Sequence, residues 1–193
     1  MTMSRPRSRG DRPPPPPESC VARAVDALAR RAYARAELGQ HLLRKGFTEP
    51  VVAAALDRLA ERGYLDDVAY ARSFVHSRLT GRAYGPRRVR TELARRGVAP
   101  GVVEQALAEH AEERAGAAYD ESSESGGPPV DLVRVAARRR LGALRGLAPD
   151  VARRRLVGWL VRRGFGLGES ARVARDLVAF PDRETDGCVA SED

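Results

Sequence analysis

The sequence predicts an all-α protein of three tandem three-helix repeats that form an elongated, curved array. Three observations favour this fold class. Apolar residues follow the spacing of a buried helix face, as in Val51, Val52, Ala55 and Leu56. No stretch shows the sustained alternation with β-branched residues that is typical of strands. A short phrase also occurs three times, which indicates repeats.

Composition divides the 193 residues into six segments. These are a disordered Arg/Pro-rich arm (1–19), a first helical repeat (20–65), a second (66–115), an acidic Ser/Gly/Pro linker (116–129), a third repeat (130–180) and an acidic disordered tail (181–193). Each repeat is expected to hold a leading, a middle and a third helix. The leading helices are predicted near 21–35, 67–79 and 130–146.

Capping residues mark where these helices begin and end. Asp66 or Asp67 is available to cap the leading helix of the second repeat. Pro86 and Pro100 stand where first helical turns should begin, because the N–H that proline lacks is unpaired there. Glycines stand where helices should stop, at Gly46, Gly63, Gly97 and Gly164.

The repeated phrase closes each middle helix. It reads apolar residue, two cations, glycine and apolar residue, and it ends at Phe47, Val98 and Phe165. Cations in a last helical turn complement the negative end of the helix dipole. Trp159, beside the third copy, is predicted to be the large core residue of its repeat, and Tyr70 and Phe74 are predicted to lie in the core of theirs.

The charge pattern is strongly basic and unevenly distributed. The chain has 34 basic and 26 acidic residues, and every basic residue except Lys45 is arginine. The surplus lies in the repeats, at +8 for 131–180, whereas 181–193 carries −4. Two explanations of the excess of arginine over lysine stay open: a genomic preference for arginine codons, or selection for side chains that bind phosphate and carboxylate groups.

Several classes of function lack support in the sequence. No apolar run approaches the ~20 residues that cross a bilayer, and no secretory signal is present, so we expect a cytoplasmic protein. Cys20 and Cys188 lie in predicted tails and offer no disulfide framework. The three histidines lack partners at ligand spacing, and neither a phosphate-binding loop nor a nucleophile elbow occurs. We therefore predict no metal, no cofactor, no catalytic residue and no enzyme activity.

Ordered motifs across 35–110 resemble those of the RecX family of bacterial regulatory proteins. They are Arg35-Ala36-Glu37-Leu38, Leu42-x-x-Lys45-Gly46-Phe47, Gly63-Tyr64-Leu65-Asp66-Asp67-x-x-Tyr70-Ala71-x-x-Phe74, and Gly85-Pro86-Arg87-Arg88-x-x-x-Glu92-Leu93-x-x-x-Gly97-Val98. The third repeat matches mainly through 160–165, whereas the arm, the linker and the tail lie outside the pattern.

The resemblance implies an all-helical regulator of DNA repair and the SOS response. Proteins of this family bind the RecA recombinase filament on DNA and cap or destabilise it, which inhibits strand exchange, ATPase and co-protease activity. The expected partners are therefore the RecA filament and, directly, DNA. We expect the chain to act as a monomer.

Arginines at three kinds of position are the candidate contacts with a partner or nucleic acid. Arg87, Arg88 and Arg90 follow Pro86 at a helix start, where N–H groups and the dipole favour anions. The others close middle helices or form two triplets: Arg95, Arg96, Arg162 and Arg163, then Arg138, Arg139, Arg140, Arg153, Arg154 and Arg155. Adjacent helical residues point about 100° apart, so no triplet presents all its side chains on one face.

Two other interpretations stay open. The basic repeats also suit a sequence-nonspecific DNA- or RNA-binding protein that acts without a recombinase, and steep salt dependence on naked DNA would favour that. A helical scaffold for acidic partners is the third interpretation.

Overall fold

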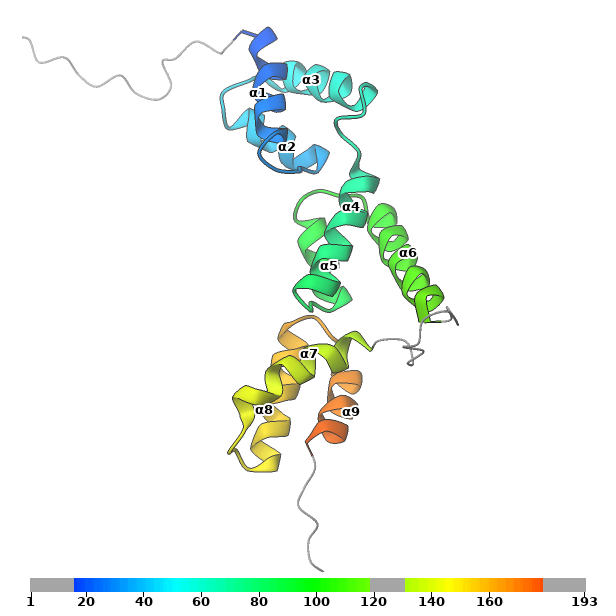
Figure 1. The fold of residues 1–193 in the computed structure, drawn as a ribbon. Coiled ribbons are helices and arrows are strands. Elements are labelled where there is room, and N and C mark those ends of the chain that lie inside the picture. Colours follow the sequence, from blue (N-terminus) through cyan, green and yellow to red (C-terminus); the bar gives the residue numbers. More distant parts are fainter. Residues whose placement is uncertain (1–15, 119–130, 179–193) are drawn as a thin grey trace, which may run out of the picture. The chain divides into compact units, whose positions relative to one another are not determined.

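A computed structural model describes residues 16–118 and 131–178, and every regular element within them is helical (Figure 1). The helices are α1 (Glu18–Leu28), α2 (Arg35–Leu43) and α3 (Glu49–Glu61); α4 (Asp67–His76), α5 (Pro86–Ala94) and α6 (Pro100–Ala118); and α7 (Leu132–Leu141), α8 (Pro149–Arg162) and α9 (Leu167–Leu177). The predicted all-α class and tandem three-helix organisation are confirmed. The arm up to residue 15, the linker from 119 and the acidic tail lie outside the described residues.

The leading helices differ from the prediction at their ends. α1 begins at Glu18, inside the segment predicted to be disordered. α4 ends at His76 and continues as a π-helical turn, η1 (Ser77–Gly81). α7 ends at Leu141 and is followed by a 3-10 turn, η2 (Gly142–Leu144).

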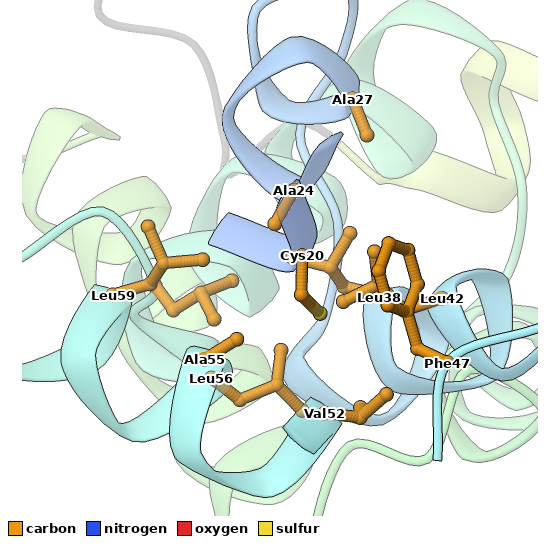
Figure 2. Packing of buried hydrophobic residues seen from close by; sticks show 11 residues of the cluster. Cys20, Ala24, Ala27, Leu38, Leu42, Phe47, Val52, Ala55, Leu56 and Leu59 are labelled. Atoms are coloured by element: carbon orange, nitrogen blue, oxygen red, sulfur yellow. The ribbon is translucent and has the colours of Figure 1, made fainter. Parts of the chain in front are cut away.

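Cys20 belongs to the first core, contrary to its predicted place in a tail. It is fully buried with Ala24, Leu38 and Leu42 between α1, α2 and α3 (Figure 2). Full burial of one leucine stabilises the fold by about 1.5–3 kcal/mol. Burial also raises the pKa of the Cys20 thiol, which favours its unreactive protonated form.

The four predicted glycine stops are confirmed by left-handed backbones. Their φ angles are 93° at Gly46, 72° at Gly63, 76° at Gly97 and 95° at Gly164. Beyond each glycine the next N–H reaches back to the helix, as from Phe165 to the Leu160 carbonyl at 3.2 Å. The repeated phrase is therefore a repeated helix ending, and glycine tolerates its conformation without strain.

The third core is anchored by Phe165, not by Trp159. Phe165 is buried with Leu156, Leu160 and Val173 where α7, α8 and α9 pack together. Trp159 is only half-buried at the edge of this cluster, so its predicted role as the core anchor is wrong. The turn after Gly164 directs the residue that follows it into the core, whereas Trp159 precedes the buried Leu160 and lies at the margin.

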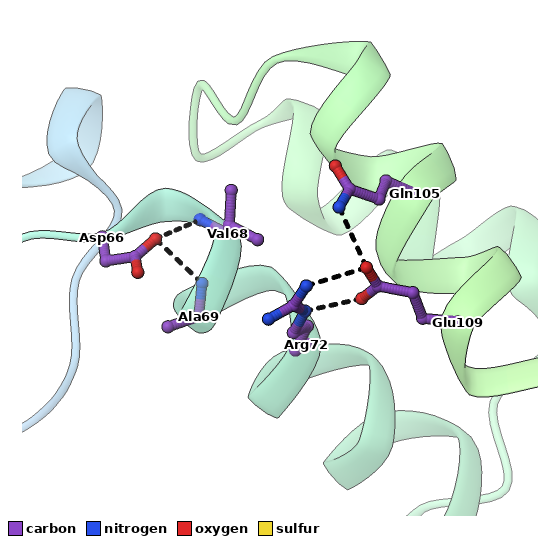
Figure 3. Close-up of polar contacts among 6 residues, drawn as sticks. All are labelled: Asp66, Val68, Ala69, Arg72, Gln105 and Glu109. Carbon is purple, nitrogen blue, oxygen red and sulfur yellow. Dashed lines mark hydrogen bonds and ion pairs between the residues drawn. The ribbon is translucent and has the colours of Figure 1, made fainter. Parts of the chain in front are cut away.

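The adjacent carboxylates of the second repeat cap two different helices. Asp66 Oδ1 accepts from the N–H groups of Val68 at 2.8 Å and Ala69 at 3.0 Å, which confirms an N-cap for α4 (Figure 3). Asp67 Oδ1 accepts from the backbone N–H of Arg35 at 2.8 Å. Asp67 therefore satisfies the first turn of α2, a long-range role that local spacing does not reveal.

The described residues pack as two compact units. The first unit comprises 16–75 and 90–110, and the second comprises 76–89, 111–118 and 131–178. In each unit another segment of the chain lies close to the glycine of a repeated phrase. In the first unit, a Cβ on Gly97 would overlap the Cβ of Ala36. In the second unit, a Cβ on Gly164 would lie 2.5 Å from the backbone nitrogen of Arg88.

Candidate nucleic-acid interface

The net charge of the described chain lies almost entirely in the second unit. Its described residues carry 17 arginines and 6 acidic residues, a formal charge of +11. The described residues of the first unit carry 12 basic and 11 acidic residues, a formal charge of +1. A surplus of this size favours a polyanionic partner for the second unit.

Some of these arginines line an open hollow beside α8. The hollow has a volume of about 430 Å³, and its charged lining consists of Arg140, Arg154, Arg155 and Arg162. Trp159 supplies the aromatic wall, and none of the described residues that line this hollow is acidic. Arg154, Arg155 and Arg162 are solvent-exposed, so their guanidinium groups are accessible to a ligand.

A second hollow shares Arg140 and Trp159 with the first. It has a volume of about 540 Å³ and lies against the segment that follows η1. The lining adds four residues with charged or aromatic side chains, Arg82, Tyr84, Arg139 and Arg163, and within the described parts of the chain it includes no acidic side chain. We call the two together the double hollow, which brings seven arginines and two aromatic rings into one site.

Guanidinium groups and aromatic rings alternate along the double hollow. Arg163 lies 5.0 Å from the centre of the Tyr84 ring and 4.5 Å from that of Trp159. Arg88 lies 4.0 Å from the Tyr84 ring, and Arg140 lies 5.9 Å from the Trp159 ring. Cation–π attraction therefore orders these side chains before any ligand arrives.

Backbone carbonyls fix two of the arginines. Arg163 Nη1 donates to the Arg82 carbonyl at 2.7 Å, and Arg139 Nη1 donates to the Gly81 carbonyl at 3.3 Å. These carbonyls follow the π-helical turn η1, and Ala83 beside them has a left-handed φ of 50°. This strained conformation costs on the order of 1–3 kcal/mol and is typical of segments shaped for a function.

The helix start at Pro86 is closed to anions at its backbone. The Arg87 N–H donates to the Gly164 carbonyl at 3.2 Å, and the Gly85 N–H donates to the Arg163 carbonyl at 2.8 Å. The negative end of α8 thus meets the positive end of α5, which corrects the prediction of N–H groups available to bind an anion here. The Arg87 side chain is exposed, whereas that of Arg88 covers Tyr84.

Arg90 is paired with an acidic residue. It belongs to the first unit and forms a two-pronged ion pair with Glu104, at 2.7 and 2.9 Å. The hydrogen bonds that Arg90 donates to Glu104 lower the pKa of Glu104 and raise the pKa of Arg90. A carboxylate within the chain therefore engages the charge of Arg90.

The other predicted contact residues that do not line the double hollow have different surroundings. Arg96, just after α5, donates to the Glu92 carbonyl of that helix at 2.8 Å and covers the ring of Phe74. Phe74 is half-buried rather than in the core. Tyr70, whose ring centre lies 6.0 Å from that of Phe74, is also half-buried.

Arg153 donates twice to the Val178 carbonyl, at 2.9 and 2.7 Å, and so caps the end of α9. Arg95 and Arg138 are exposed outside the double hollow.

Acidic residues neutralise arginines in the first unit. Arg72 donates to both carboxylate oxygens of Glu109, at 2.5 and 2.8 Å, and Gln105 adds a third hydrogen bond at 2.9 Å (Figure 3). These bonds lower the pKa of Glu109 to about 2. Arg31 with Glu37 and Arg35 with Asp57 form further pairs. None of the ion pairs among the described residues includes one of the seven arginines of the double hollow.

Arg82 and Tyr84 are the site residues that sequence reasoning missed. They lie between the predicted leading helix and Pro86, in a stretch with no helical periodicity. An aromatic residue flanked by arginines, as in Arg82-Ala83-Tyr84, was the available signal.

The described residues were also searched for membrane-spanning helices and for metal sites. Across 16–118 and 131–178, no helix combines the length and apolar character needed to cross a membrane. In the same ranges, histidine, cysteine and acidic side chains form no group of three that could hold a metal ion.

Comparison with known proteins identifies the family of the chain. Residues 20–59 match the model of the first three-helix domain of RecX, and 66–107 match that of the second. A crystal structure of RecX from Lactobacillus salivarius shares the fold, with a TM-score of 0.65 and 16% identity over 83% of this chain and 96% of that one.

Relatives cover most of the chain. Regulatory protein RecX of Thermobifida fusca is 34% identical over 174 residues, 88% of this chain and 86% of that protein. Regulatory protein RecX of Pseudomonas putida strain GB-1 is 38% identical over 137 residues, 70% of this chain and 87% of that protein. The chain therefore belongs to the RecX family of regulatory proteins.

Proposed function

We propose that this protein binds the RecA recombinase filament on DNA and inhibits its strand exchange, ATP turnover and co-protease activity, thereby modulating DNA repair. Family membership supports the regulatory role. In this proposal the protein acts as a cytoplasmic monomer and is not itself an enzyme.

One observation carries the contact with the filament: the +11 charge of the described part of the second unit, where seven arginines and no described acidic residue line the two hollows. A nucleoprotein filament presents DNA phosphates and acidic protein surfaces in a regular array, which suits such a surface. The first unit is near neutral, and Arg35, Arg72 and Arg90 within it are paired with acids, so it makes a weaker electrostatic contact.

The test is a titration of the cognate recombinase, assembled on single-stranded DNA, with the full-length protein. We expect co-sedimentation with the filament and a saturable loss of ATP turnover. A variant with R154Q, R155Q and R162Q should inhibit more weakly, because it loses three exposed cations of the double hollow.

A matched control carries R44Q, R58Q and R62Q, which remove the same charge from exposed positions of the first unit. It should inhibit like the parent protein. Binding to naked DNA without any effect on the recombinase would contradict the proposal and favour a nonspecific nucleic-acid-binding protein.

A further inference from the structure

We infer that the double hollow binds single-stranded nucleic acid, with phosphates against its arginines and an unstacked base against Trp159. This inference deepens the proposed function, on which it rests for the source of the strand. It names the chemistry that one surface of the second unit recognises.

Accessible cations are the first requirement for holding a phosphate backbone, and the double hollow supplies them. Arg154, Arg155 and Arg162 are exposed, and the described ion pairs engage none of them. All three line the 430 Å³ hollow together with Arg140. Planar guanidinium forks match phosphate oxygens with two hydrogen bonds each.

A place for a base is the second requirement. Trp159 is half-buried, and it lines both hollows at their common boundary. Arg163 covers the indole closely at 4.5 Å, but Arg140 lies at 5.9 Å in a looser contact. Displacement of Arg140 toward a phosphate therefore exposes indole surface on which a base can stack.

Concavity favours a single strand over a duplex. In a duplex the bases are stacked and paired, so phosphates can reach the rim arginines while no base reaches Trp159. A single strand can present one base to each hollow, because every base has a face that stacks on an aromatic ring or a guanidinium plane. An acidic protein would satisfy the arginines but would leave the aromatic surface unused.

The chain provides its own probe for this site, because Trp159 is its only tryptophan. Titration of the full-length protein with an oligothymidylate of about 15 nucleotides, near the upper site size of one binding module, should quench Trp159 emission saturably. A duplex of equal length should bind with little quenching. The titrations contain no recombinase, so their failure would leave the proposed inhibition standing, and failure of inhibition would leave them unaffected.

Variants separate the two contacts, with the anisotropy of a labelled oligothymidylate as the readout. R154Q with R155Q and R162Q should weaken binding by about ten-fold or more and flatten its salt dependence. R44Q with R58Q and R62Q, equal in charge, should stay within about two-fold, because the loss is local. W159A should lose about five-fold or more, the lower end for one stacked base, whereas W159F should retain most of the affinity.

Three results would overturn the inference. The first is saturable oligothymidylate binding without a change in Trp159 emission. The second is equal loss of affinity in the two triple-arginine variants. The third is quenching of Trp159 by polyglutamate at the same affinity and salt concentration, which would identify a surface for an acidic protein. Circular dichroism of each variant checks that the helices remain folded.

Discussion

Gly85 and Gly164 approach so closely that neither residue can accept a side chain. A Cβ on Gly85 would overlap the carbonyl group of Gly164, and a Cβ on Gly164 would lie 2.5 Å from the Arg88 nitrogen. The Gly85 N–H donates to the Arg163 carbonyl at 2.8 Å. The end of α8, at Arg163 and Gly164, therefore packs against the start of α5. This junction positions Tyr84 and Arg163 in the double hollow.

Substitution at this junction should destabilise the second unit. We expect G85A to lower the free energy of unfolding by about 1–3 kcal/mol, the usual cost of forcing extra atoms into a packed site. G164A should cost more, because it adds left-handed strain to the overlap. Urea denaturation followed by circular dichroism measures both.

Gly63 provides the control that separates strain from crowding. It has a φ of 72°, yet no atom would lie within 4 Å of an added Cβ. G63A should therefore cost only the conformational penalty, about 1 kcal/mol. Equal losses for G63A and G164A would show that the close approach of Gly85 and Gly164 does not matter for stability.

The two neighbouring aspartates should act independently, because they cap different helices. D66A removes the cap of α4, and D67A removes the acceptor of the Arg35 N–H at α2. Each should lower the free energy of unfolding by about 1 kcal/mol, and D66N should retain most of its cap. Chemical denaturation of the double variant should show near-additive losses; a strong non-additive term would contradict separate capping roles.

Glu109 should titrate far below an ordinary glutamate. Its pKa is lowered from 4.5 to about 2, first by the hydrogen bond from Arg72 and then by that from Gln105. Because the folded value is the lower one, this carboxylate stabilises the fold above about pH 4.5 and loses that contribution as the pH falls toward 2.

NMR titration of the Glu109 side-chain carboxyl group measures this shift directly. R72Q should raise the pKa toward 4.5, and Q105A should raise it less, since the Gln105 hydrogen bond is the smaller cause. The pair is exposed, so added salt should weaken its effect on acid stability. A pKa near 4.5 in the parent protein would contradict the ion pair.

Deletion of 181–193 should strengthen binding to single-stranded DNA at low salt. The segment lies outside the described residues, and only its net charge of −4 enters the expectation. Its removal lessens repulsion of the phosphate backbone, so affinity should rise several-fold at low ionic strength and converge with the parent at high salt. Affinity that is unchanged at low salt would argue against an electrostatic role for the tail.

Glycine, proline and capping residues predicted the helix ends at which they stand, whereas the leading helices, placed by periodicity, differ at their ends. The glycine phrases and Pro86 specify helix ends through their own backbone preferences, and Asp66 lies at its cap position for the same reason. Asp67 could be assigned only its first-turn place in α4, because its bond to Arg35 joins two repeats.

The candidate site was predicted only in part. The triplets in 131–180 pointed to the right repeat, but spacing along a helix did not show that Arg153 turns back to Val178 while Arg154 and Arg155 line a hollow. The place of Tyr84 in the double hollow could not be predicted from the sequence. It depends on a π-helical turn and on the left-handed backbone of Ala83, and neither conformation produces a periodic pattern in the sequence.

The central claim is most directly tested by the rate of ATP hydrolysis of the cognate recombinase on single-stranded DNA, titrated with the full-length protein. We predict a saturable fall in that rate, which the R154Q, R155Q and R162Q variant reproduces only at higher concentration and the R44Q, R58Q and R62Q variant reproduces fully. A rate that stays constant at large excess of the protein would contradict the claim.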